Sequence, residues 1–154
     1  MRLSEILVPG AVKILPRASS KKRLLCDLAE IAKSVHGLEY DATFSALQDR
    51  EALGPTGVGE GVALPHARLA GLDEVRGVFV KLEQPIDFSA MDRKPVDLIF
   101  ALFAPEGAGV AHLKALALVS RTLRDPGLCA KLRANSEPAL LYTLLTEAQA
   151  SEAA

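Results

Sequence analysis

Residues 50–66 read Arg-Glu-Ala-Leu-Gly-Pro-Thr-Gly-Val-Gly-Glu-Gly-Val-Ala-Leu-Pro-His. The four glycines at 54, 57, 59 and 61 can adopt positive φ, so positions 54–61 are predicted to form a loop. The apolar run 62–64 predicts a short strand that Pro65 ends. A nucleotide-binding loop is excluded, because no lysine follows the glycines and the expected order is helix, loop, strand.

Outward from this segment, the pattern predicts an α/β domain of the mixed α+β kind. Helical and strand spacings follow one another along the chain without strict strand–helix–strand repetition, so a mixed sheet is expected. The expected strands cover 12–15, 62–64, 78–83 and 96–104, the last one covered on both faces. Three helices are expected before the glycine loop: a short one over 3–7, one capped by Ser19 or Ser20 and ended by Gly37, and one capped by Asp41 and ended by Gly54-Pro55. Three more are expected after the last strand: one over 110–124, one capped by Asp125, and a last one opened by Ser136-Glu137-Pro138. The helix over 110–124 is expected to carry Leu113, Leu116, Ala117, Ser120 and Leu123 on one side.

The composition is that of an ordinary globular domain. The 154 residues are 49% hydrophobic and 24% charged, with a formal net charge of −1. That balance argues against general nucleic-acid binding, which needs a basic excess. No apolar run reaches the roughly 20 residues of a membrane helix, and the first residues lack the apolar core of a signal peptide. We therefore expect no membrane insertion, and a cytoplasmic location in which Cys26 and Cys129 stay reduced.

His66 is the candidate nucleophile. A neutral imidazole is a good nucleophile near pH 7 because its pKa lies there. Phosphoryl transfer onto such a ring needs positive charge and N–H donors around the phosphoryl oxygens. Arg50 can supply a bidentate clamp, and His112, at the start of a predicted helix, can donate a ring N–H. Glu60 can orient His66 or another donor in the loop.

Each of these residues also has an ordinary interpretation. A lone histidine is most often a plain surface or core residue, Arg50 alone is typical of a solvated helix face, and His112 can simply be exposed. His36 lies at a predicted helix C-terminus, where a cation suits the helix dipole. Three scattered histidines without metal-ligand spacing argue against a metal site, and a Ser-His-Asp hydrolase lacks its Gly-x-Ser-x-Gly turn. We expect no cofactor, and structural roles for both cysteines.

The same segment resembles the active-site signature of a known family. Arg50-Glu51, the glycine loop and Gly61-Val62-Ala63-Leu64-Pro65-His66 resemble the fructose/mannitol-type enzyme IIA domains of the bacterial phosphotransferase system. The resemblance extends from Leu3-Ser4-Glu5-Ile6-Leu7 to the last helix. This opening, the free-standing length and His112-Leu113-Lys114-Ala115-Leu116 are most similar to the nitrogen-regulatory branch, enzyme IIA-Ntr.

The resemblance implies a mixed, mainly five-stranded sheet with helices on both faces. It implies that His66 accepts a phosphoryl group from HPr or its nitrogen-branch relative NPr, as a histidyl intermediate of a phosphotransferase. By the same resemblance, His112 and Arg50 match the residues beside the phosphorylated histidine, and Glu60 matches the loop glutamate. For the nitrogen-regulatory branch it implies signal transduction, in which target proteins of the transporter or sensor-kinase type are bound according to phosphorylation state.

Two outputs stay open at this point. One is regulation of partner proteins, and the other is transfer of the phosphoryl group to a IIB domain for fructose or mannitol uptake. In either case a carrier protein must dock around His66, and Val58, Leu64, Ala108 and Val110 are the candidate rim. We expect one domain over 1–154, with an ordered core over 3–147 and a frayed tail over 148–154. The sequence does not specify the oligomeric state or the ring nitrogen of His66 that is modified.

Overall fold

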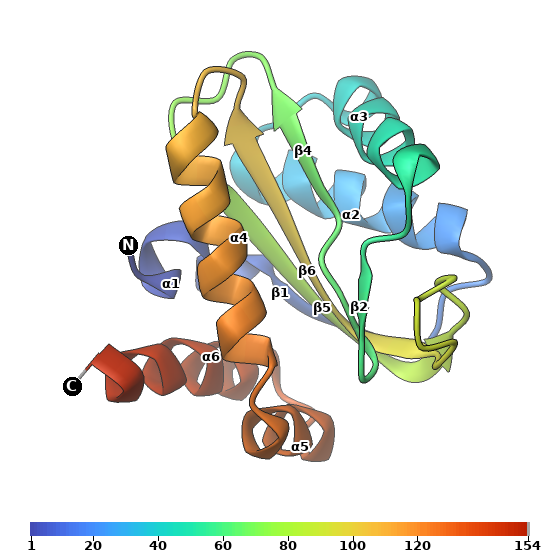
Figure 1. Ribbon diagram of the computed structural model, residues 1–154, viewed down its shortest axis with the longest axis vertical. Coiled ribbons are helices and arrows are strands. Elements are labelled where there is room, and N and C mark those ends of the chain that lie inside the picture. The colour runs from blue at the N-terminus through green and yellow to red at the C-terminus, as the bar shows by residue number, and fades with distance from the viewer. Residues whose placement is uncertain (154) are drawn as a thin grey trace.

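The computed structural model describes the backbone of residues 1–153 and the side chains of residues 1–148 (Figure 1). The helices are α1 (Leu3–Ile6), α2 (Lys21–His36), α3 (Tyr40–Leu53), α4 (Gly109–Leu123), α5 (Pro126–Ala134) and α6 (Pro138–Ala153), with a 3-10 turn at Pro9–Ala11. The strands are β1 (Val12–Leu15), β2 (Gly57–Gly59), β3 (Val62–Ala63), β4 (His66–Leu69), β5 (Arg76–Ile86) and β6 (Val96–Pro105).

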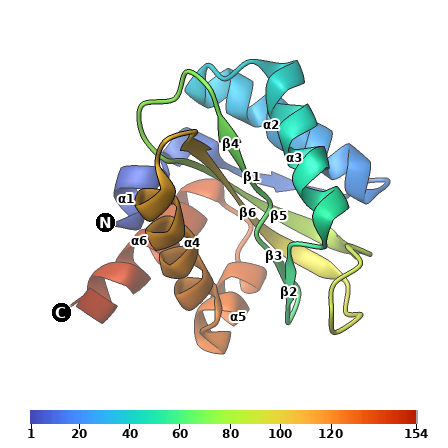
Figure 2. The same cartoon turned by 45° about the horizontal axis from the view of Figure 1, so that its top comes forward.

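These strands form one mixed sheet, as the absence of strict strand–helix repetition predicted. Its order is β1-β5-β6-β3-β2, and β4 also pairs with β6. The β1–β5, β3–β6 and β4–β6 pairs are parallel, whereas β5–β6 and β2–β3 are antiparallel. Helices cover both faces, with α2 and α3 on one side and α4 and α6 on the other (Figure 2).

The sheet has six strands rather than about five, because the predicted strand over 62–64 continues beyond the proline as β4 and because the predicted loop over 54–61 contains β2, which pairs with β3. β3 and β4 keep the same register on β6, since Val62 pairs with Leu98 and His66 pairs with Leu102. Pro65 has no N–H to give to the ladder. Its carbonyl still accepts from the Leu102 N–H at 2.9 Å. The proline therefore interrupts the strand without displacing it, and His66 begins the second half.

The central strands are buried on both faces. In β6, every residue from Leu98 to Ala104 is fully buried, as the continuous apolar run predicted. The sequence of β5 alternates in the way expected for a strand, but both of its faces are buried: Phe79 and Lys81 are buried as well as Val78 and Val80. The reason is that β5 lies between β1 and β6 and is covered by helices. The Lys81 ammonium is satisfied by the carbonyls of Arg133 and Asn135 at the end of α5.

Most helix boundaries follow local capping chemistry. Ser20 caps α2 through the Arg23 N–H, Gly37 ends α2 with a φ of 69°, and Asp125 caps α5. The predicted cap of α3 by Asp41 is wrong, because the Glu39 carboxylate accepts from the N–H groups of Asp41 and Ala42.

The buried face of α4 is also turned relative to the prediction. Leu113 is 65% exposed, Ala117 is exposed, and the helix buries His112, Ala115, Leu118, Val119, Thr122 and Leu123. Since α4 packs on β6, its inner face carries His112 toward the strands that hold His66. The helix is therefore rotated about its axis relative to the prediction, so that His112 faces the sheet and Leu113 is exposed.

The expected frayed tail over 148–154 lies almost wholly outside the residues whose side chains the structure describes. The expectation of a single domain with an ordered core over 3–147 stays a prediction. None of the helices in the described part of the chain is long and apolar enough to span a bilayer.

Gly77 on β5 tests the packing between the sheet and α1. A Cβ at this position would lie 2.7 Å from Cε1 of Phe100 and 3.0 Å from Cγ2 of Ile6. We expect Gly77→Ala to lower the free energy of unfolding by about 1–3 kcal/mol, since overpacking forces core side chains to shift. Urea unfolding measures this. Gly107→Ala, where a Cβ meets nothing within 4 Å, is the control, and equal stability of both variants would contradict the packing argument.

Candidate functional site

His66 stands at the strand interruption with one ring nitrogen fixed. Its Nδ1 lies 2.8 Å from the carbonyl oxygen of Leu64. A carbonyl oxygen only accepts hydrogen bonds, so Nδ1 carries the proton and donates it. The other nitrogen, Nε2, is therefore unprotonated and presents a lone pair. The ring is half-buried, which keeps it ordered while one edge stays accessible.

Arg50 brings a positive charge to that lone pair. It lies near the end of α3, and its Nε donates to Nε2 of His66 at 3.2 Å while Nη1 donates to the Gly54 carbonyl at 2.9 Å. Within the described residues no carboxylate forms an ion pair with this guanidinium. Arg50 is thus held by neutral groups only, and its charge is available to an anion.

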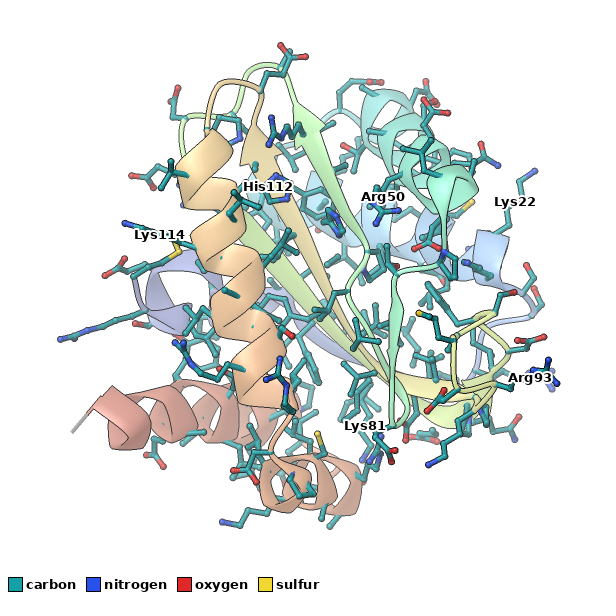
Figure 3. All side chains as sticks on the ribbon, in the orientation of Figure 1. Lys22, Arg50, Lys81, Arg93, His112 and Lys114 are labelled. Atoms are coloured by element: carbon teal, nitrogen blue, oxygen red, sulfur yellow. The ribbon has the colours of Figure 1, made fainter. Side chains whose placement is uncertain are left out.

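His112 supplies an unused donor on the opposite side. Its Nδ1 accepts from Nε of Arg68 at 3.2 Å, so the proton resides on Nε2. The residue is 5% exposed, and this Nε2 has no hydrogen-bond partner among the described residues. The rings of His66 and His112 have centroids 5.4 Å apart at an interplanar angle of 76°. Arg50 comes from α3 and His112 from α4, on the two sides of β4 (Figure 3).

Both imidazoles are kept neutral by their surroundings. Burial lowers the pKa of His66 below its ordinary value, and Arg50 lowers it further, against the opposing effects of the Leu64 carbonyl and the Glu51 carboxylate. Burial also lowers the pKa of His112, with His66 and Arg68 acting in the same direction. A neutral His66 is the nucleophilic form, and a neutral His112 still donates through Nε2.

Glu60 does not take part in this cluster. It occupies the turn between β2 and β3 with a φ of 55°, and its side chain is 84% exposed. Its carboxylate binds the Lys94 ammonium at 3.1 Å, and its N–H donates to Asp92 at 2.8 Å. In this structure the hairpin directs the Glu60 side chain toward the 92–94 loop and not toward His66, and the expectation that Glu60 orients His66 or another donor in the loop stays a prediction.

Two neighbours of the site were missed by the sequence analysis. Arg68 holds the His112 ring, and it lies two positions after His66 on β4, a spacing that places both on one face of a strand. Glu51 is the carboxylate closest to the site in the chain, and its side chain is 6% exposed. Glu51 stands beside Arg50 in the segment that resembles the active-site signature, but its spacing gave no sign that it pairs with Lys21, which lies 30 positions earlier in the chain.

Exposed apolar side chains occur on the elements near the cluster. Of the predicted rim, Val58 on β2 is 57% exposed and Val110 on α4 is 68% exposed. Leu64, between β3 and β4, is 5% exposed and belongs to the core instead. Ala108 is half-buried. Leu53 at the end of α3 and Leu113 on α4 add two exposed apolar residues that the sequence analysis did not assign to the rim.

The other histidine and the cysteines have structural surroundings. His36 donates from Nε2 to the Gly77 carbonyl at 2.9 Å, and burial lowers its pKa, so the expected cationic partner of the helix dipole is instead a neutral donor to β5. Cys129 is buried and Cys26 is partly buried. Among the described residues, no three His, Cys, Asp or Glu side chains are grouped so as to hold a metal ion.

Comparisons with known proteins match this fold over nearly its whole length. Residues 5–148 match the family described as phosphoenolpyruvate-dependent sugar phosphotransferase system, EIIA 2. A nitrogen regulatory protein from Bradyrhizobium diazoefficiens is 45% identical over 145 residues, which cover 94% of this chain and 95% of that relative. The crystal structure of nitrogen regulatory protein IIA-Ntr from Neisseria meningitidis has a TM-score of 0.85 at 34% identity, covering 94% of this chain and 99% of that one.

A more distant structure shows the same fold alone. It is the complex of mannitol enzyme IIA with phosphorylated mannitol enzyme IIB from Escherichia coli, with a TM-score of 0.75 at 19% identity, covering 91% of this chain and 98% of that one. The expected mannitol/fructose IIA-like architecture is therefore confirmed.

The two ring geometries predict opposite tautomers. In protein labelled with ¹⁵N in its histidines, near pH 7, we expect His66 to carry its proton on Nδ1 and His112 on Nε2. Both should titrate below the ordinary histidine pKa of about 6.5, because burial disfavours the imidazolium. NMR spectra that correlate ring nitrogens with ring protons distinguish the tautomers. A protonated Nε2 in neutral His66 would contradict the assignment made from the Leu64 carbonyl.

Proposed function

This chain belongs to the EIIA 2 family of the phosphoenolpyruvate-dependent sugar phosphotransferase system and, within it, to the nitrogen-regulatory IIA proteins, and we propose that Nε2 of His66 is its phosphoryl acceptor. The observation that carries this proposal is the unprotonated Nε2, which faces the guanidinium of Arg50 and lies beside the unpartnered Nε2–H of His112. A nucleophile, a cation and a free donor thus converge on one point.

The proposed donor is a small phosphocarrier protein of the HPr or NPr type that carries a phosphohistidine. The lone pair of His66 Nε2 attacks the phosphorus, and a new N–P bond forms. The N–P bond in the carrier breaks, and its electron pair returns to the carrier's ring nitrogen. Because Nδ1–H keeps its bond to the Leu64 carbonyl, the phosphorylated His66 ring is an imidazolium. The carrier's phosphohistidine is correspondingly protonated on its other ring nitrogen, so the carrier leaves as a neutral imidazole and no proton has to be exchanged. One N–P bond replaces another, so the step is reversible.

The charge of the transferred group is met by donors already in place. The guanidinium of Arg50 lies at hydrogen-bond distance from Nε2, where the phosphoryl oxygens arrive, and the Gly54 carbonyl holds its other side. The buried Nε2–H of His112 gains an acceptor that the unmodified protein does not offer it. Donors aimed at the developing charge accelerate phosphoryl transfer without covalent help.

The exposed apolar rim supports docking of the carrier protein. Leu53, Val58, Val110 and Leu113 come from the elements that surround His66, and each is more than half exposed. An apolar centre around a reactive residue is typical of protein interfaces. A protein, rather than a small phosphorylated molecule, is therefore the donor that fits this surface.

The output we propose is regulatory. A phosphoryl group adds nearly two negative charges to the centre of the docking face, so a partner that binds one form is excluded from the other without refolding. Target proteins of the transporter or sensor-kinase type are the proposed readers of this change. Transfer onward to a sugar IIB domain is the alternative, and the assay below separates the two when a IIB domain is added as acceptor.

His66 phosphorylation is measured by intact mass after incubation with phosphoenolpyruvate, enzyme I and an HPr-type carrier. We expect an acid-labile gain of one phosphoryl group, absent from His66→Ala. Arg50→Ala should fold normally and accept the group about 10²-fold more slowly, the cost of losing one charge-stabilising donor. His36→Gln, which changes a histidine outside the site, should be modified like the wild type. A gain that persists in His66→Ala would remove His66 from the scheme.

Docking is tested on the rim without touching the reacting groups. We expect the double variant Val110→Gln/Leu113→Gln to raise the KM for the phosphorylated carrier about tenfold, as for the loss of an interface contact, and to leave kcat near the wild-type value. Leu140→Gln, a comparable change of an exposed leucine on α6, is the control. A fall in kcat with an unchanged KM would place these residues outside the carrier interface.

A further inference from the structure

A second polar cluster lies directly behind the reactive histidine. Lys21, the first residue of α2, forms an ion pair with the Glu51 carboxylate at 2.6 Å. The same carboxylate accepts from the backbone N–H of Thr56 at 3.3 Å and from its hydroxyl. Lys21 also donates to the Phe88 carbonyl at 3.2 Å and lies 4.5 Å from the centre of the Phe88 ring. Nothing in the proposed transfer step uses these residues.

This cluster is connected to His66 through the backbone of one residue, Leu64. Thr56, held by Glu51, accepts with its carbonyl from the Leu64 N–H at 2.9 Å. Leu64 in turn accepts with its carbonyl from Nδ1–H of His66 at 2.8 Å. The position of the Glu51 carboxylate therefore sets the position of Thr56, and Thr56 sets the peptide that fixes the tautomer of His66. Networks of this kind orient reactive side chains through their neighbours.

The charge of Glu51 also matters for Arg50. The two residues are adjacent, and Glu51 is close enough to His66 to raise the pKa of that ring. In the part of the chain that the structure describes, Arg50 nevertheless has no carboxylate partner, whereas Glu51 is paired with Lys21. With a side chain only 6% exposed, Glu51 gains little screening from water, so its charge is balanced mainly by Lys21.

We propose that Lys21 is a positioning residue for phosphorylation of His66. By neutralising Glu51 it keeps that carboxylate bound to Thr56, and thereby keeps the Leu64 carbonyl on Nδ1–H and Nε2 unprotonated. By the same pairing it prevents Glu51 from turning to Arg50, whose guanidinium stays available to the phosphoryl group. This inference rests on the function proposed above, in which His66 is the acceptor.

The central test compares Lys21→Met with the double variant Lys21→Met/Glu51→Gln. Methionine keeps the apolar stem of the side chain beside Phe88 and removes the charge. In the single variant, Glu51 stays charged and unpaired, so we expect the NMR titration midpoint of His66 to rise and the rate of phosphorylation to fall about tenfold, less than the loss of a direct donor costs. In the double variant both the midpoint and the rate should return close to the wild-type values.

The titration midpoint of His66 depends on all of the charged and titratable groups around its ring. Arg50 and Glu51 face His66 from α3, and His112, with Arg68 on its other nitrogen, faces it from α4 and β4. Only the charge balance of Glu51 changes between the compared variants. Lys21→Arg, which keeps the positive charge, should behave like the wild type. Lys22→Met, which removes the neighbouring exposed lysine, should have no effect on either readout.

The outcomes separate this inference from the proposed function. A wild-type titration midpoint and phosphorylation rate in Lys21→Met would overturn the positioning role. A defect that persists in Lys21→Met/Glu51→Gln would also overturn it, because Lys21 would then act only by packing on the 87–90 loop. Urea unfolding of each variant reports a loss of folding. If the wild type itself accepts no phosphoryl group, the proposed function fails, while the midpoint, measured on unmodified protein, still tests the effect of Lys21 on His66.

Discussion

The hydrogen bond from His66 to the Leu64 carbonyl is the contact on which the site depends. It forms where Pro65 interrupts the ladder on β6: the Leu64 N–H donates to Thr56 and the Leu64 carbonyl accepts from His66, while the Pro65 carbonyl keeps the register. That one contact determines which ring nitrogen is protonated, and therefore which one holds the lone pair that the proposed phosphoryl transfer needs. The strand break costs a ladder hydrogen bond, and the buried stretch 98–104 of β6 beside it holds the two halves in line.

Around this hydrogen bond, the charge of the site depends on which groups are buried rather than on how many ionisable residues are present. The two imidazoles are neutral because burial lowers the pKa of each, and Arg50 is held only by neutral acceptors. The carboxylate next to it in the chain is directed into a separate pair with Lys21. The site thus carries the positive charge of Arg50 and, among the described residues, one buried donor without a partner, and the proposed phosphoryl group would bind to both. This explains how a protein with a net charge of −1 offers a locally cationic face.

The elements that the sequence predicted well are those whose signals are local. The caps at Ser20 and Asp125, the left-handed Gly37 and the apolar run of β6 all act within a few residues, and the structure confirms them. The errors occur where partners lie far apart in the chain. Lys81 reads as the polar face of a strand, yet it is buried because the end of α5 supplies its acceptors. Leu113 reads as a core residue, yet the side of α4 that meets the sheet carries His112.

The sequence by itself determined the mixed α/β class and the family, and it pointed to Arg50, His66 and His112, which the structure brings together, because periodicity, turn chemistry and a long contiguous motif are all encoded locally. Only the tertiary structure decided that the carboxylate beside the site is Glu51 and not Glu60, and that Nε2 of His66 is the unprotonated nitrogen. Those outcomes depend on which carbonyl, ammonium or guanidinium each side chain meets across separate strands and helices. These contacts are set by tertiary packing and burial, which cannot be predicted from the spacing of residues within one segment of the chain.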